Sequence, residues 1–212
     1  MTTFHGIRAR SRVDALCYAS ANSKLDAMRK LLEDETEIDG NGPDGMTALA
    51  VACRLAAKRS ADLLIDAGAD VDTKTKNNLT PLMLACSAGK AKGSVIALRL
   101  ISAGADVTFV RESDTMTALK FAAKKASPDV IDALIAAGAD VDGPAGTRQT
   151  ALMLAARANN VDSLKCLIAN DADPTIPCGL PWANGRNALG IANLEKRKKA
   201  AAYLATVTPD GG

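Results

Sequence analysis

One stretch of the sequence decides the fold: Thr80-Pro81-Leu82-Met83-Leu84-Ala85. Threonine is a preferred N-cap of a helix, because its side-chain oxygen accepts a hydrogen bond from an amide of the first turn. Proline follows at the first helical position, where no amide donor is needed. Leu82, Leu84 and Ala85 share one face of the short helix that follows. The stretch therefore predicts the start of a helix with an apolar face.

The same helix start recurs along the chain, in phase with a second anchor. Thr, Asp or Asn heads each copy as the expected N-cap, at Asp14, Thr47, Thr80, Thr117, Thr150 and Asn187. The second anchor is Gly-Ala-Asp-Val at Gly68, Gly104 and Gly138, echoed at Asp171, with spacings of 33 to 36 residues. Glycine ends a helix readily, because it adopts the left-handed conformation at low cost. Leu-Ile or Leu-Leu pairs between the anchors mark a second helix, so the pattern predicts six helix-turn-helix repeats.

These residues resemble the ankyrin repeat, in which a Thr-Pro-Leu-His-x-Ala helix and a Leu-Leu helix precede a Gly-Ala-Asp-Val stop. The resemblance implies an all-α ankyrin-repeat solenoid of six helix-turn-helix units with projecting hairpin-like loops. It covers residues 13–206 as a single domain, with repeats that start near residues 14, 47, 80, 117, 150 and 187. Residues 1–12 are then an N-terminal extension, and residues 207–212 are a C-terminal tail.

The sequence departs from the family pattern at two positions of the repeat. The family histidine is replaced in every copy, by Cys17, Ala50, Met83, Lys120, Met153 and Gly190. The glycine two residues before each cap is replaced by Thr115 and Arg148 in the fourth and fifth repeats. Threonine tolerates the left-handed region poorly, so we expect the loops before Thr117 and Thr150 to be reshaped.

The charge balance excludes a global electrostatic field, because 26 basic residues face 24 acidic ones. We therefore expect no membrane binding and no nucleic-acid binding. The first residues contain no apolar segment of a secretory signal, so we expect a cytoplasmic protein, with a nuclear location left open. The basic run Lys196-Arg197-Lys198-Lys199 is read as the polar outer face of a terminal repeat, and a short localisation signal is the alternative.

Catalytic and metal chemistry find little support in the sequence. The single histidine, His5, lies outside the repeats, and no Cys/His cluster or acidic calcium loop is present. Cys53 and Cys86 occupy a repeat position that alanine fills elsewhere, which predicts small buried side chains. Cys178 lies in a long loop, and the sequence leaves two alternatives for its thiol, exposed or buried. We expect no enzyme activity, no metal and no cofactor.

The resemblance implies that a partner binds a concave face formed by the loop tips and the first helices. Mapping those positions onto this sequence gives a candidate partner-binding set: Asp44, Met46, Arg54, Lys76, Asn77, Arg111, Asp114, Met116, Lys120, Lys124, Lys125, Arg148, Gln149, Arg157 and Trp182. Its helical members are basic, which predicts a protein partner with an acidic patch, while ordinary solvated charges are the alternative.

The predicted function is therefore a protein-protein interaction module that acts as a scaffold or adaptor, monomeric by itself. A stand-alone inhibitor or immunity-type protein that blocks a partner enzyme or toxin is the alternative.

Overall fold

The protein folds into helical hairpins in the computed structural model, which describes residues 2–89, 91–143 and 149–208. The chain forms two compact halves, residues 1–106 and 107–212, and each is described by itself. The helix order confirms a repeat fold of helix-turn-helix units.

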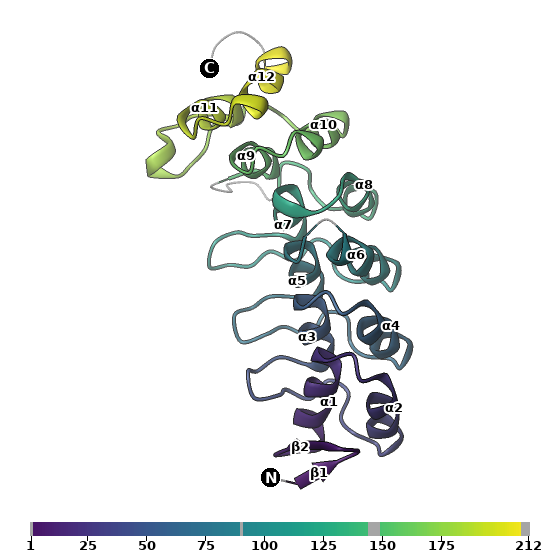
Figure 1. Cartoon of the computed structure of the whole chain (residues 1–212). Coiled ribbons are helices and arrows are strands. Elements are labelled where there is room, and N and C mark those ends of the chain that lie inside the picture. The colour runs from purple at the N-terminus through teal and green to yellow at the C-terminus, as the bar shows by residue number, and fades with distance from the viewer. Residues whose placement is uncertain (1, 90, 144–148, 209–212) are drawn as a thin grey trace. The chain divides into compact units, whose positions relative to one another are not determined.

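The N-terminal half begins with an antiparallel hairpin and continues with three helical hairpins (Figure 1). Its elements are β1 (Thr2–Phe4), β2 (Ile7–Ala9), α1 (Arg12–Ala21), α2 (Leu25–Glu33), α3 (Ala48–Arg54), α4 (Lys58–Asp66), α5 (Pro81–Ser87) and α6 (Lys92–Ser102). The first helices α1, α3 and α5 pack on one another in order, and α4 packs on α6 beside them. The loops of this half project from the side of the first helices, as Figure 1 shows.

The C-terminal half repeats this arrangement with a modified last loop. Its elements are α7 (Ala118–Lys125), α8 (Pro128–Ala136), α9 (Ala151–Arg157), α10 (Val161–Ala169), the 3-10 helix η1 (Pro181–Ala183), α11 (Ala188–Leu194) and α12 (Lys198–Val207). Helix α9 packs between α7 and α11, and α10 contacts α8 and α12. The long loop expected after Asp171 therefore carries its own helical turn, η1.

The helix starts confirm the expected caps in five of six repeats. The side-chain oxygens of Thr47, Thr80, Thr117, Thr150 and Asn187 accept an amide of the first turn. The expectation for Asp14 is wrong, because α1 begins earlier with Ser11 as its N-cap and Asp14 lies in the first turn. Ser11 is the N-cap because its hydroxyl oxygen accepts a hydrogen bond from the Asp14 amide at 3.0 Å.

The core of each half consists of small and medium aliphatic side chains. The alanines five residues after each cap position are fully buried, and so are Cys53 and Cys86, as the small-residue interpretation expects. Burial raises the pKa of the Cys86 thiol to about 12, so this cysteine stays a protonated, inert thiol. The three residues added near Ala91–Ser94 lengthen α6, whose Gly93 lies close to the Ala85 carbonyl of α5.

Polar bonds also join successive repeats within each half. The carboxylates of Asp39, Asp72 and Asp142 accept the backbone amides of Asp70, Asp106 and Asp173, each in the next loop, at 2.9 to 3.1 Å. These bonds hold neighbouring loops in register.

The hairpin β1–β2 is a feature that the sequence analysis did not identify. Ile7 and Ala9 of β2 are buried against the first repeat, while His5 bonds to Asp34 at 2.8 Å. The His5-Gly6 turn has left-handed torsion angles at both residues, as a tight hairpin requires. The extension thus covers the apolar side of α1.

The loop before Thr117 is reshaped, as expected. Its closing bond, from the Arg111 amide to the Met116 carbonyl oxygen, spans five residues, whereas the equivalent bond from Gly42 to Met46 spans four. Thr115 adopts a left-handed φ of 58°, close to the values of 66° and 71° at Gly45 and Gly185 in the equivalent positions. The loop is therefore one residue wider than its counterparts, and a β-branched residue still adopts the left-handed conformation at this position. Arg148, at the same position of the next repeat, lies outside the described residues.

We predict that Gly93→Ala destabilises the protein, although alanine is normally the better helix former. A Cβ at Gly93 would lie 2.5 Å from the Ala85 carbonyl oxygen, so two packed helices must separate. Urea unfolding should show a loss of about 1–3 kcal/mol, the usual cost of overpacking.

The matched control is Gly190→Ala, where the added Cβ meets the side chain of Arg186 in an exposed loop. The nearest atom is Arg186 Cβ at 2.8 Å, so the exposed loop must shift. Such a shift is easier than separating two packed helices, so the control should lose less stability. An unchanged or raised free energy of unfolding for Gly93→Ala would contradict the close approach of α5 and α6.

Candidate functional site

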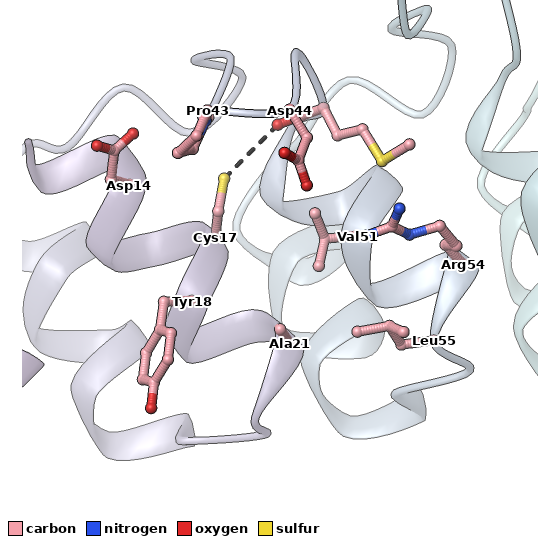
Figure 2. A pocket seen from close by; sticks show the side chains of 11 residues that line it. Asp14, Cys17, Tyr18, Ala21, Pro43, Asp44, Val51, Arg54 and Leu55 are labelled. Atoms are coloured by element: carbon pink, nitrogen blue, oxygen red, sulfur yellow. Dashed lines mark hydrogen bonds between the residues drawn. The ribbon is translucent and has the colours of Figure 1, made fainter. Parts of the chain in front are cut away.

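The N-terminal half carries a groove of about 210 Å³ between helices α1 and α3 and the loop before α3. We define this N-terminal groove by its lining residues: Asp14, Cys17, Tyr18, Ala21, Gly42, Pro43, Asp44, Met46, Val51, Arg54 and Leu55. Figure 2 shows Tyr18 and Ala21 on one helix and Val51, Arg54 and Leu55 on the next, with Pro43 and Asp44 on the loop above them. The walls are mainly apolar, and charged groups stand at the edge.

Cys17 fixes the loop side of the N-terminal groove. Its thiol donates to the Met46 carbonyl oxygen at 3.6 Å, the bond drawn in Figure 2. A Cβ on Gly42 would meet this sulfur at 2.8 Å, so the loop backbone lies directly against the thiol. Burial raises the pKa of the Cys17 thiol to about 11, which keeps its proton available for the bond. Cys17 therefore positions the loop and is not a nucleophile.

Two apolar side chains give this groove the character of a docking site. Tyr18 is 49% exposed and Leu55 is 51% exposed, although both lie among small buried residues of α1 and α3. An exposed aromatic residue beside an exposed leucine and an arginine is typical of interface centres. The next loop contributes Lys76, whose aliphatic stem lies over Gly45.

The C-terminal half carries a second pocket, of about 200 Å³. We define this C-terminal pocket by its lining residues: Ser113, Asp114, Thr115, Met116, Lys120, Gln149 and Leu180. The loop before Thr117 forms one wall of this pocket. It is closed by a hydrogen bond from the Arg111 amide to the Met116 carbonyl oxygen at 2.9 Å. The Arg111 guanidinium also donates to Asp114 Oδ1 at 2.9 Å and holds the pKa of that carboxyl below its usual value.

Lys120 is buried more deeply than the sequence analysis expected of a residue on the partner-binding surface. The residue is only 1% exposed, and its Nζ donates to the Thr115 carbonyl oxygen at 2.8 Å. Burial lowers the pKa of Lys120 to about 8, and the charges of Asp114 and Asp140 oppose that shift. Helical position indicated the correct face, but the adjoining loops cover the lysine.

A third group of candidate residues lies at the last loop. The Arg157 guanidinium stacks over the Trp182 ring at 4.8 Å, and its Nε lies 3.5 Å from a Glu195 carboxylate oxygen. Trp182 is 41% exposed. The tryptophan therefore both covers the arginine and remains available to a partner.

The structure brings many of the candidate residues together, but within separate groups. Asp44, Met46 and Arg54 line the N-terminal groove, and Lys76 and Asn77 are exposed on the next loop. Asp114, Met116, Lys120 and Gln149 line the C-terminal pocket, with Arg111 bonded to Asp114. Lys124 and Lys125 are exposed at the end of α7 and line neither site.

Sequence reasoning missed Tyr18 and Thr115 as site residues. Tyr18 stands four residues after Asp14, where every other repeat carries an aliphatic residue or phenylalanine, so its hydroxyl was the available signal. Thr115 was recognised as the cause of a reshaped loop, but not as a residue that lines a pocket.

The described residues offer little for other chemistry. They hold no cluster of three His, Cys, Asp or Glu side chains suited to a metal ion. All five cysteines are buried, including Cys178, for which both placements were open. None of the helices in the described ranges has the length and hydrophobicity that crossing a bilayer requires.

Comparison with known proteins gives consistent matches to one family. A family model of three ankyrin repeats matches residues 5–75 and 56–145, and a single-repeat model matches residues 147–178. A chain in the structure of the Bd0816 predatory endopeptidase from Bdellovibrio bacteriovorus in complex with immunity protein Bd3460 superposes with a TM-score of 0.78. It is 22% identical, and the match covers 91% of this chain and 97% of that one. This likeness shows the fold.

Two curated relatives are much longer than this chain. A homologue of transient receptor potential cation channel subfamily A member 1 from Caenorhabditis elegans is 32% identical over 129 residues, which span 60% of this chain and 10% of the relative. Human ankyrin repeat and KH domain-containing protein 1 is 38% identical over 97 residues, which span 45% of this chain and 4% of the relative. The chain therefore matches a tenth or less of each relative.

We predict that Lys120→Met stabilises the protein at pH 7 by about 1–2 kcal/mol, because it removes a buried ammonium. Methionine already fills the equivalent buried positions as Met83 and Met153. The gain should shrink as pH rises from about 8 toward 10.5, the folded and ordinary pKa values of this lysine. In that window the unfolded chain binds more protons than the folded one, so the wild type gains stability relative to the variant.

Urea unfolding of both proteins at pH 7 and pH 10 measures this difference. Lys124→Met, on the same helix but exposed, is the control and should give nearly equal stability at both values. A wild type that is more stable than Lys120→Met at pH 7 would contradict the prediction.

Proposed function

This chain belongs to the ankyrin repeat family, and from that premise we propose that it binds a protein partner as a scaffold or adaptor. The contact surface is the face of loops and first helices in each half. The observation that carries this proposal is the N-terminal groove, where Tyr18 and Leu55 are exposed beside Arg54. An apolar centre with a charged edge is the usual composition of a protein interface.

Charge supports an acidic partner. Lys124 and Lys125 are exposed at the end of α7, and Arg157 is half-exposed at the end of α9, where α7 and α9 pack side by side. Arg157 keeps a Glu195 carboxylate nearby, whereas the described residues show no ion pair for the two lysines. Three cations on adjacent helix ends favour an acidic patch on the partner and accelerate association at low salt.

A stand-alone inhibitor is the second candidate function. It is supported by the likeness to a chain in a structure that joins an endopeptidase to an immunity protein. The two functions share one binding face and differ in what happens to the partner, whose activity is retained on a scaffold and lost under an inhibitor. We infer a binding role and no catalytic one, because the buried thiols and the single ion-paired histidine offer no activated nucleophile.

We predict that the double variant Lys124→Glu, Lys125→Glu weakens partner capture by at least about tenfold, the effect of roughly 1.4 kcal/mol in binding free energy. Affinity capture from native extract identifies the partner, and titration at two salt concentrations gives the affinity. The residual binding should depend less on salt, because two cations no longer attract the partner.

Lys165→Glu on the second helix α10 is the matched control, since it changes an exposed lysine away from the first helices. It should leave the affinity unchanged. An assay of the captured protein then separates the two candidates, because loss of its activity indicates an inhibitor. Equal affinity of the wild type and the double variant would overturn the acidic-partner proposal.

A further inference from the structure

The C-terminal pocket contains a buried cation without a counter-ion. Lys120 is 1% exposed, yet within the described ranges its Nζ forms no ion pair, and its one hydrogen bond goes to the neutral carbonyl of Thr115. Proteins rarely bury an ammonium unless it is paired, because the loss of hydration is costly. An ammonium has three N–H donors, so Lys120 retains donors for another group.

A second donor lines the same pocket. The Gln149 side-chain nitrogen is buried and, among the described residues, has no hydrogen-bond partner. Buried amide nitrogens normally find an acceptor, so each exception needs an explanation. Lys120 and Gln149 come from different repeats and line one pocket, which therefore offers donors from two sides.

The carboxylate in the pocket wall, that of Asp114, is already engaged. Both Asp114 oxygens accept from Arg111, and Oδ1 also accepts the Met116 amide at 3.2 Å. Asp140 acts on Lys120 through its charge but forms no ion pair with it in the described residues. Because Asp114 is occupied in this way, the remaining donors of Lys120 and Gln149 favour a ligand that brings oxygen atoms and negative charge.

The pocket wall also holds the strained residue of the repeat. Thr115 keeps a φ of 58°, and the bond from Lys120 to its carbonyl oxygen closes the wall. The equivalent residues Gly45 and Gly185 also have positive φ, so this conformation belongs to the repeat, and here it brings the Thr115 carbonyl oxygen within reach of Lys120. The outlier and the two donors therefore lie at one place.

We propose that the C-terminal pocket receives one Asp or Glu carboxylate of the protein partner, held by Lys120 Nζ and the Gln149 side-chain nitrogen. This inference rests on the proposed function and names the chemistry of one contact within it. A carboxylate fits better than a neutral carbonyl, because its two oxygens can serve two donors and its charge compensates the buried ammonium. Met116 and Leu180 give the entering side chain an apolar wall.

The experiment uses a blocked glutamate, N-acetyl-glutamate N-methylamide, as the probe and requires no partner. At constant ionic strength, NMR titration should give saturable shifts at the amides of Thr115, Met116 and Gln149. The glutamine analogue, which has the same shape without the charge, should bind at least about tenfold more weakly. The ε-carbon titration of Lys120 should show a higher pKa with the glutamate probe, because a nearby anion favours the charged lysine.

Variants locate the site. Lys120→Met should abolish the saturable shifts, and Lys165→Met, at an exposed lysine of α10, should leave them intact. If Lys120→Met changes the spectrum of the free protein, Gln149→Leu decides, because it removes the second donor and should weaken the probe. The inference is overturned if the probe gives no saturable shifts, if the glutamine analogue binds equally, or if the deciding variant binds like the wild type.

These outcomes are independent of partner capture. If the protein binds the glutamate probe but captures no partner, the carboxylate site is supported and the proposed function is rejected. A protein that captures a partner but ignores the probe retains the function and loses this inference.

Discussion

The close approach of neighbouring first helices is the constraint on which the structure depends. Each first helix carries an alanine five residues after its cap position, and Ala19, Ala52, Ala85, Ala122, Ala155 and Ala192 are all fully buried. A methyl side chain lets helices pack at short distance, so leucines from adjacent repeats can share one core. A single helical hairpin cannot bury its apolar face alone, and stacking supplies the missing surface. The loops and their carboxylate bonds follow from this spacing.

The parts of the fold that sequence reasoning predicted are those set by short-range chemistry. A threonine cap and a glycine stop act within one helical turn, so Thr47, Thr117 and Gly68 could be interpreted without knowledge of the neighbours. Ser11 and the β1–β2 hairpin were missed because they depend on competition between caps and on the apolar side of α1. At Thr115 the expected reshaping of the loop is found, but the sequence did not show that threonine itself would take the left-handed conformation that its local propensity disfavours.

The position three residues after the cap connects the fold to its function. The stacking is the same in each repeat, so the residue at this position decides what the adjoining loop does. Cys17 donates to the Met46 carbonyl oxygen of the next repeat, whereas Lys120 donates to the Thr115 carbonyl oxygen of its own loop. Met153 instead accepts the Thr150 amide through its sulfur at 3.5 Å. One column of the repeat therefore holds loops by three different chemistries.

For the candidate site, the sequence predicts which helix face a residue occupies but not how deeply its side chain is buried. Helical periodicity shows which face Lys120 occupies, yet its burial is decided by loops that other repeats supply, including Gly143, whose Cβ would lie 3.2 Å from Lys120 Cε. The same limit applies to Tyr18, which remains 49% exposed with the Lys24 ammonium 5.1 Å from its ring centre. A lysine covered in this way cannot act as an ordinary surface charge. Its ammonium loses hydration on burial, and a single carbonyl oxygen replaces only part of that loss. An incoming carboxylate is therefore more favourable there than at the exposed lysines of the same helix.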